Sequence, residues 1–304
     1  MDLNGLKQHN AQRILQHMKT ILKAPSWVNN YHLDYKSIDE VPSSFFAEVN
    51  IKLNALQNKA PLVTILIAAW NEELNIIRNI ASLADLNTKY PIEIIVVNNN
   101  STDRTQQTLD KLNVTNYFQK IQGCGPARQL GMERAKGKYI LLADADCVYP
   151  PIWVDEMMAE LTKPNVACVY GRYSFIPEAG FPRWKLYLLE KLKDVAAELR
   201  QLKRPYLNAY GISMGYVKEF GLKAGYIMHN TRGDDGRLCF DLMQFGKIMP
   251  VRSNEARVWT APRTLQRDGS FTTALFSRLK LEFGNVISLF TPHPSHDTKT
   301  SKNE

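Results

Sequence analysis

The chain has 304 residues, of which 44% are hydrophobic, so it is long enough to bury a substantial core. Its net charge of +8 favours acidic partners. Nucleic acid is not expected among them, because basic residues are scattered between acidic ones and no nucleic-acid-binding motif is present. No apolar stretch reaches the roughly 20 residues that span a bilayer, and the N-terminus lacks the apolar core of a signal peptide, so we expect a cytoplasmic protein.

Residues 1–60 are expected to form an N-terminal helical extension that packs on the rest of the protein. The spacing of apolar residues predicts an amphipathic helix over residues 3–23. Residues 24–58 are predicted to be irregular, with apolar side chains between Phe45 and Leu56 that dock on the following domain. A surface for a partner protein is the alternative role of this extension.

Apolar runs and helical periods alternate from residue 61 onward. Long runs of Val, Ile and Leu predict strands that are buried on both faces, over residues 61–68, 92–97 and 139–143. Apolar residues at helical spacing predict helices between and after these strands, over residues 72–86, 103–112 and 126–135. This order predicts an α/β fold with a doubly wound, mostly parallel sheet flanked by helices.

Polar residues follow each of the three predicted strands. Asp144 and Asp146 follow the third strand, and the clusters 70–73 and 98–103 follow the first and the second. Because ligands of parallel sheets bind beyond the carboxyl ends of the strands, the three clusters should line one crevice. Two carboxylates at such close range favour a divalent cation and a phosphorylated ligand. Turn capping by the two aspartates is the alternative.

A second amphipathic helix is predicted over residues 184–203. Its apolar positions are Leu188, Leu189, Leu192, Val195, Ala196, Leu199 and Leu202, and basic residues, Lys185, Lys191, Lys193 and Arg200, are expected on the opposite face. The apolar face could pack in the core or could lean on an anionic membrane surface. The sequence leaves both possibilities open.

Four segments of the chain, in this order, resemble family 2 glycosyltransferases. They are VTILIAAWNEE at 63–73, EIIVVNNNSTD at 93–103, GPARQLGMERAKGKYILLADAD at 125–146 and, more loosely, RGDDGRL at 232–238. The resemblance covers roughly residues 61–263 and implies a GT-A fold. It implies a nucleotide-binding half over residues 61–150 and an acceptor-binding half over 151–290. The polar residues 291–304 are expected to form a disordered tail.

The resemblance implies a metal-dependent enzyme that moves a sugar from a nucleotide-diphosphate donor, preferably a UDP-sugar, to an acceptor hydroxyl with inversion. Asp146 would bind Mn²⁺ or Mg²⁺ directly, and Asp144 would contact ribose or a metal-bound water. The acceptor would be a saccharide or a lipid-linked saccharide in cell-envelope or polysaccharide synthesis. The enzyme would then work in the cytoplasm, with a possible peripheral position at the inner face of the membrane.

The resemblance also implies residues that bind the nucleotide. Ala68 and Trp70 would lie near the base, although Trp70 could also be an ordinary core residue. Asn99 stands where relatives often have an aspartate, and its amide can both donate and accept hydrogen bonds. Arg128 matches a basic residue near the diphosphate or the strand-end aspartates, and a surface salt bridge is its alternative role.

In the second half, Asp235 is the implied general base, and Asp234 would orient it or bind the acceptor. The alternative is that this pair caps a helix predicted over residues 236–245. The basic stretch that includes Arg252, Arg257, Arg263 and Arg267 matches a region that often closes over the diphosphate. A solvated basic surface is the other interpretation of that stretch.

Two other functions compete with sugar transfer. A sugar nucleotidyltransferase would need a Gly-rich loop with basic residues after the first strand, and AAWNEE has neither. A non-catalytic relative that only binds nucleotide or carbohydrate would be expected to have lost the aspartate pair or the base. Both are intact in this chain, so we favour the transferase.

Overall fold

The computed structural model describes residues 21–230, 233–263, 265, 273, 280 and 284. Nearly all of the helix predicted over 3–23, Arg267 and the predicted tail 291–304 lie outside these residues. The strands are β1 (Val63–Ala69), β2 (Ile92–Asn98), β3 (Thr115–Phe118), β4 (Tyr139–Asp144), β5 (Cys147–Val148), β6 (Val166–Tyr170), β7 (Tyr173–Phe175), β8 (Met214–Val217), β9 (Lys247–Pro250) and β10 (Val258–Thr260). The α-helices are α2 (Ser26–Asn29), α3 (Ser43–Leu56), α4 (Asn75–Ala84), α5 (Thr105–Leu109), α6 (Cys124–Arg134), α7 (Trp153–Leu161), α8 (Arg183–Gln201), α9 (Lys218–Ala224) and α10 (Asp234–Leu242).

The main sheet has the strand order β3-β2-β1-β4-β8-β6-β9. Its first four strands are parallel, β8 runs antiparallel to both neighbours, and β6 and β9 are parallel. A smaller sheet, β5-β10-β7, lies beside it. The predicted α/β fold with a mostly parallel sheet between helices is therefore confirmed.

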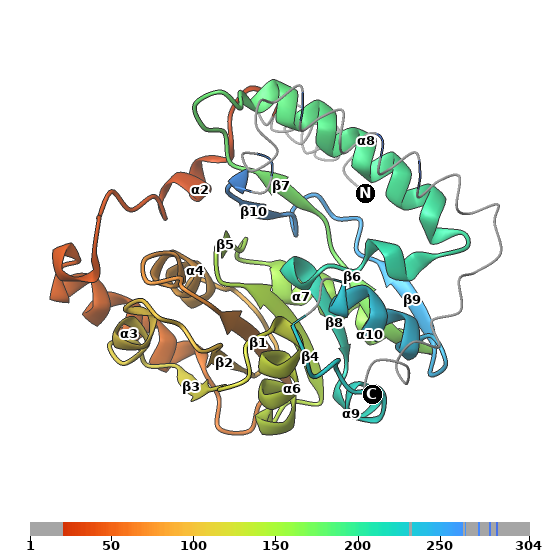
Figure 1. Ribbon diagram of the computed structural model, residues 1–304, viewed down its shortest axis with the longest axis horizontal. Coiled ribbons are helices and arrows are strands. Elements are labelled where there is room, and N and C mark those ends of the chain that lie inside the picture. The colour runs from red at the N-terminus through yellow and green to blue at the C-terminus, as the bar shows by residue number, and fades with distance from the viewer. Residues whose placement is uncertain are drawn as a thin grey trace, which may run out of the picture.

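Helices cover both faces of the main sheet (Figure 1). Side chains of α3, α4 and α7 share one buried cluster with Ile65 and Ile67 of β1. Side chains of α6 and α10 share a second cluster with Leu66. Successive residues of β1 thus point into opposite cores, which explains why the strand is apolar along its whole length.

The prediction of an irregular segment over residues 24–58 is wrong in its second half, which forms α3. Phe46, Val49 and Leu53 are spaced three and four residues apart, so they lie on one face of the helix. All three are buried in the cluster that also contains Val63 of β1. The residues do dock on the domain, but they do so as a helix.

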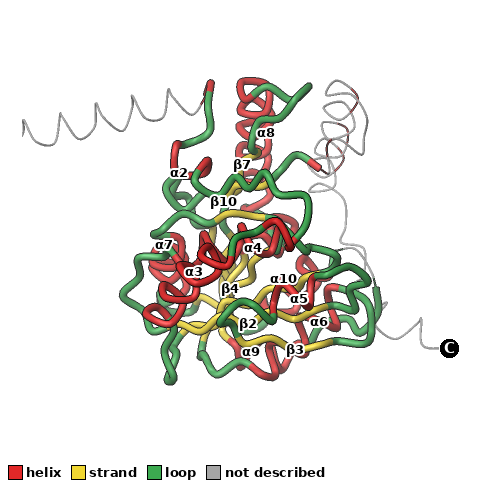
Figure 2. Tube along the Cα trace, turned by 90° about the vertical axis from the view of Figure 1, so that its left-hand side faces the viewer, coloured by secondary structure: helices red, strands yellow, loops and turns green. Residues whose placement is uncertain are grey.

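Helix α8 lies at the outer edge of the molecule, over β7 and β10 (Figures 1 and 2). Its inner side includes Leu186 and Leu189, which cluster with Phe175 and Phe181. Glu190 forms a buried ion pair with Arg183 at 2.8 Å. Within the part of the chain that the structure describes, no helix is long and apolar enough to cross a membrane.

Candidate active site

The ends of β1 and β2 are held together by Asn71. Its backbone has a φ of 54°, in the left-handed region that asparagine tolerates better than most residues. The side-chain oxygen of Asn71 accepts a hydrogen bond from the backbone amide of Thr102 at 2.8 Å, and the backbone amide of Asn71 donates to the Ser101 hydroxyl at 3.0 Å. The first two polar clusters therefore form one connected edge, as expected from the strand order.

The turn that carries Asp144 and Asp146 is fixed from behind. The amide of Asn79, on α4, donates to the carbonyls of Asp144 and Cys147, each at 3.0 Å. The Asp144 amide donates to the Tyr149 hydroxyl at 2.8 Å. The side chains of Asp144 and Asp146 remain 40% and 26% exposed. The backbone groups of this turn thus form hydrogen bonds within the protein, while both carboxylates stay accessible to a ligand.

Arg128, on α6, lies at the centre of the candidate site. Its Nη1 atom is 3.0 Å from Asp234 and 2.5 Å from Asp235, and its Nη2 atom is 3.2 Å from Asp144. Arg128 is only 5% exposed, so the interpretation as a surface salt bridge is wrong. One buried guanidinium connects the strand-end aspartate to the aspartate pair of α10.

Gly211 provides room for this arrangement. A Cβ atom at this position would lie 1.8 Å from Nη2 of Arg128 and 3.1 Å from a carboxylate oxygen of Asp235. The Gly211 amide donates to the same Asp235 oxygen at 2.8 Å. Residue 211 must therefore lack a side chain for Arg128 to sit where it does.

Burial is the main cause that raises the pKa of Asp144 to about 7; Arg128 opposes the shift, and the negative charges of Asp146 and Asp235 add to it. Water reduces the shift, since 40% of this side chain is exposed. Burial is also the main cause of the raised pKa of Asp235. The cluster places three carboxylates, Asp144, Asp234 and Asp235, around one guanidinium, so it is short of positive charge.

Two further arginines lie near Asp146. Arg263 is 3.3 Å from Glu72 and 3.6 Å from Asp146. Arg78, on α4, is partly buried, and its Nε atom has no hydrogen-bond partner among the residues that the structure describes. Burial and the charge of Arg263 lower the pKa of Arg78. Arg78 was not predicted as a site residue, because it is one of several polar residues of a helix and its buried, unpaired nitrogen is evident only from the described structure.

The residues at this edge could provide part of the coordination of a divalent cation, with the bound diphosphate and water providing the rest. Among the described residues, no group of three or more His, Cys, Asp or Glu side chains could hold a metal ion. Asp144 and Asp146 offer two hard oxygen donors, and Mg²⁺ commonly takes one or two carboxylates together with substrate phosphates and water. The excess of carboxylates near Arg128 also favours a cation.

The predicted base-binding residues line the same edge. Trp70 is 50% exposed, so its interpretation as an ordinary core residue is wrong. Ala68 pairs with Asp144 across the β1–β4 ladder. The Asn99 side-chain oxygen accepts from the Gly123 amide at 3.1 Å. Its Nδ2 has no hydrogen-bond partner within the described part of the chain, which leaves a donor for a ligand.

Asp234 and Asp235 lie in the first turn of α10, whose N-cap is Gly233 with no side-chain capping bond. Their interpretation as helix caps is therefore wrong. Of the predicted basic stretch, Arg252 and Arg257 instead pair with carboxylates of α8, at 2.7 Å and 2.5 Å. Arg263 alone among the described arginines of this stretch is near Asp146.

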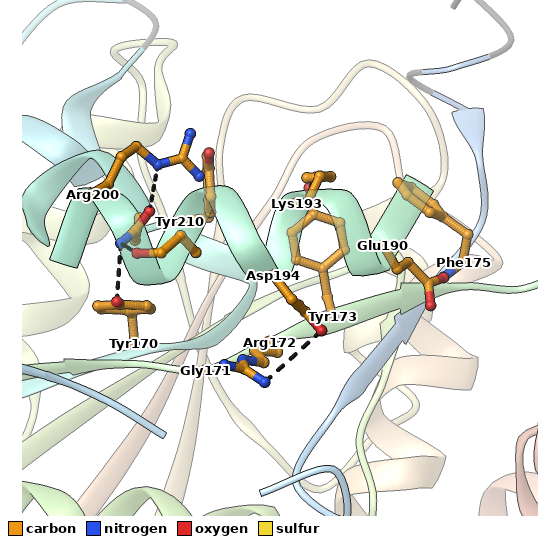
Figure 3. Close-up of a pocket in the computed structure, with 12 residues that line it drawn as sticks. Tyr170, Gly171, Arg172, Tyr173, Phe175, Glu190, Lys193, Asp194, Arg200 and Tyr210 are labelled. Atoms are coloured by element: carbon orange, nitrogen blue, oxygen red, sulfur yellow. Dashed lines mark hydrogen bonds and ion pairs between the residues drawn. The ribbon is translucent and has the colours of Figure 1, made fainter. Parts of the chain in front are cut away.

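A small pocket lies between α8 and the segment 170–175, and Tyr210 also lines it (Figure 3). Lys193 lies over the ring of Tyr173, 4.1 Å from its centroid. The rings of Tyr173 and Tyr210 meet edge to face, with centroids 6.1 Å apart, and Tyr210 is 40% exposed. Because Tyr210 directly precedes Gly211, this aromatic pocket is linked through one residue to Asp235.

Residues 64–220 match the family model described as "Glycosyl transferase family 2". The chain belongs to glycosyl transferase family 2. This confirms the family that was predicted from the sequence, and with it the class of transferases. An uncharacterised glycosyltransferase of Rickettsia bellii is 33% identical over 136 residues, which cover 43% of this chain and 20% of that protein. The chain spans only 20% to 36% of the length of two such curated relatives.

Two solved structures of glycosyltransferases show the same fold. One is a mannosyltransferase from Pyrobaculum calidifontis in complex with GDP-Man and Mn²⁺, with a TM-score of 0.52, 15% identity, and coverage of 81% of this chain and 75% of that one. The other is GalNAc-T7 with UDP, GalNAc and Mn²⁺, with a TM-score of 0.51, 19% identity, and coverage of 67% and 44%. Family 2 membership and the GT-A fold therefore agree.

Proposed function

We propose that this family 2 chain is an inverting, metal-dependent glycosyltransferase that transfers a sugar from a nucleoside-diphosphate donor to an acceptor hydroxyl. The observation that carries the proposal is Arg128, which contacts both Asp144 at the donor edge and Asp235 on α10. A donor site and a candidate base are thereby held in one cluster. Transfer between two bound substrates needs such proximity.

The donor would bind along the β1–β2–β4 edge. The exposed ring of Trp70 and the free amide donor of Asn99 would bind the base, beside Ala68. We prefer a UDP-sugar. The GDP-Man and UDP complexes of the two similar structures support a nucleotide-sugar donor but do not discriminate between a uracil and a guanine nucleotide.

Asp146 would hold a divalent cation directly, and Asp144 would support it. When bound, Mn²⁺ or Mg²⁺ would neutralise the charge that grows on the departing diphosphate. Both similar structures contain Mn²⁺, which supports this choice of cofactor. Arg263, 3.6 Å from Asp146, and Arg78, whose pKa the charge of Asp146 affects, would bind the same phosphates.

Asp235 would take the proton from the acceptor hydroxyl as the hydroxyl oxygen attacks the anomeric carbon from the face opposite the diphosphate. Its raised pKa suits this role, because a base works best when its pKa is near the working pH. Asp234 shares Arg128 with it and would hold the guanidinium in place. The acceptor, a saccharide or a lipid-linked saccharide, would approach from the aromatic pocket at Tyr210.

We also propose that the enzyme acts in the cytoplasm, in cell-envelope or polysaccharide synthesis. The rival function, sugar nucleotide formation, has less support. The residues between β1 and α4, 70–74, contain no glycine and no basic residue to cradle a nucleoside triphosphate.

A panel of UDP- and GDP-sugars with Mn²⁺ or Mg²⁺ tests the function, with nucleoside diphosphate release as the signal. We expect release with one class of donor, and loss of that release with chelator. A chain that instead forms pyrophosphate from a nucleoside triphosphate and a sugar phosphate would be the rival enzyme. Absence of both reactions, together with normal nucleotide binding, would indicate the non-catalytic relative.

A further inference from the structure

Helix α8 carries a continuous row of apolar side chains that face away from the core. They are between 42% and 80% exposed: Trp184, Leu188, Leu192, Val195, Leu199 and, just after the helix, Leu202. Every exposed residue of α8 belongs to this row. The spacing of three and four residues places them on one line of the helix, about 27 Å long. We call this line the apolar row.

The apolar row is distinct from the surface that attaches α8 to the domain. That surface uses Leu189 and Ala196, the two buried members of the apolar positions predicted for this helix. It also uses acidic residues, since Asp194 is 2.5 Å from Arg257 and Glu190 accepts hydrogen bonds from Ser174 and Phe175 of β7 at 2.9 Å and 2.8 Å. Core packing therefore accounts for the inner side of α8 and leaves the apolar row unexplained.

Basic residues border the apolar row. By helical position, Lys185 lies along one side, followed by Lys203 just after the helix, and Lys191, which is 3.6 Å from Asp194, lies along the other. Glu198, the acidic residue nearest the row, is engaged by Arg172 and Arg252 at 2.5 Å and 2.7 Å. The border is therefore positive, in keeping with the net charge of +8. This corrects the expected distribution, in which all basic residues lay opposite the apolar face.

We propose that the apolar row inserts into the surface of an anionic lipid bilayer. Apolar side chains flanked by lysines, with a tryptophan at one end, match the chemistry of a helix that lies in the interface of such a membrane. The row is also narrow, on the order of 500 Å², below the roughly 800 Å² per partner that a stable protein interface buries. Figures 1 and 2 show α8 at the edge of the molecule.

The consequence for acceptor choice rests on the proposed function. The pocket of Tyr173 and Tyr210 lies directly beneath α8 (Figure 3). A membrane that contacts the outer side of α8 would bring a lipid-linked acceptor within reach of this pocket. Binding to lipid itself needs no sugar transfer, so the two proposals can fail separately.

Flotation of the full chain with lipid vesicles tests the docking surface. The vesicles contain phosphatidylcholine alone or mixed with phosphatidylglycerol, at low and high salt. The test variant combines Leu192→Gln, Val195→Gln and Leu199→Gln, and the control is Ile51→Gln, which changes a 70% exposed residue of α3. We expect binding to anionic vesicles that salt weakens, because exposed charges are screened. The triple variant should lose on the order of 100-fold in partitioning, and the control should not.

Three results would overturn the proposal. The first is that the native chain does not bind anionic vesicles at low salt. The second is that the native chain binds neutral vesicles as well as anionic ones. The third is a triple variant that binds as well as the native chain. A fall in melting temperature or a change of oligomeric state in the triple variant, without vesicle binding by the native chain, would assign the apolar row to a protein contact.

Discussion

Replacement of Asp235 by asparagine tests the proposed base most directly. Asp235 accepts one hydrogen bond from Arg128 at 2.5 Å and one from the Gly211 amide at 2.8 Å, each on a different oxygen. Asparagine has only one acceptor oxygen, so either orientation of its amide turns an NH₂ group toward an N–H donor. The substitution therefore removes the proton acceptor and at least one of the two hydrogen bonds.

The cost to stability should be modest. A hydrogen bond to a charged group contributes about 1.5–3 kcal/mol. The loss is partly offset, because Asp235→Asn leaves two carboxylates instead of three around Arg128 and lowers their mutual repulsion. We expect a net destabilisation below about 2 kcal/mol, or a few degrees in melting temperature for a chain of this size. Sugar transfer should fall by at least about 100-fold, the low end for a general base.

Transfer to the acceptor and calorimetric binding of nucleoside diphosphate should be measured on the same preparations. We expect affinity to stay close to that of the native chain while transfer falls. Asp241→Asn is the matched control, because Asp241 is in the same helix but pairs with Arg237. Near-native transfer by Asp235→Asn would refute the base and the inverting mechanism built on it. Equal losses in both variants would indicate a general defect of α10.

Three other substitutions test the surrounding site. Gly211→Ala should displace Arg128 and reduce transfer on the order of 100-fold, whereas Gly236→Ala, whose added carbon would meet only a carbonyl oxygen at 3.3 Å, should not; equal activity of the two would contradict the packing argument. Asp146→Asn should weaken nucleoside diphosphate binding with Mn²⁺ or Mg²⁺ present but not with chelator, and calorimetry that finds no difference would remove the metal assignment. Arg78→Gln should raise the melting temperature slightly and lower diphosphate affinity about 10-fold, because it removes a partly buried cation whose Nε has no hydrogen-bond partner among the described residues; unchanged affinity would exclude this contact.

The first half of the fold was predictable because its strands are buried on both faces. Residues 63–69 and 92–98 of the structure are almost continuously buried, and an apolar run of that length has few other interpretations. Strands β6 to β10 have between three and five residues, too few to show a period. Helix α3 was missed because its buried face has only Phe46, Val49 and Leu53 among 14 residues.

Some residues of the candidate site were likewise predictable from the sequence and others were not. The strand-end aspartates and asparagines could be found from their position after apolar runs, and Asp235 from a resemblance. The contacts of Arg128 could not, because its partners lie 16, 106 and 107 residues away along the chain. Nothing local in the sequence distinguishes Arg78 from other arginines. The segment from Gly211 to Gly215 loosely resembles a glycine-containing acceptor-side segment of the family, but the contact of Gly211 with Arg128 depends on neighbours from distant segments.

The close approach of Gly211 to Arg128 also limits which pairs of residues relatives can have at these two positions. With 1.8 Å between a Cβ at position 211 and the guanidinium, an alanine there is incompatible with arginine at 128 in this pose. Substitutions at the two positions should therefore occur together. A relative with a side chain at position 211 should have a residue shorter than arginine at position 128. In an alignment of relatives we therefore expect these positions to covary, although 83 positions separate them in the sequence.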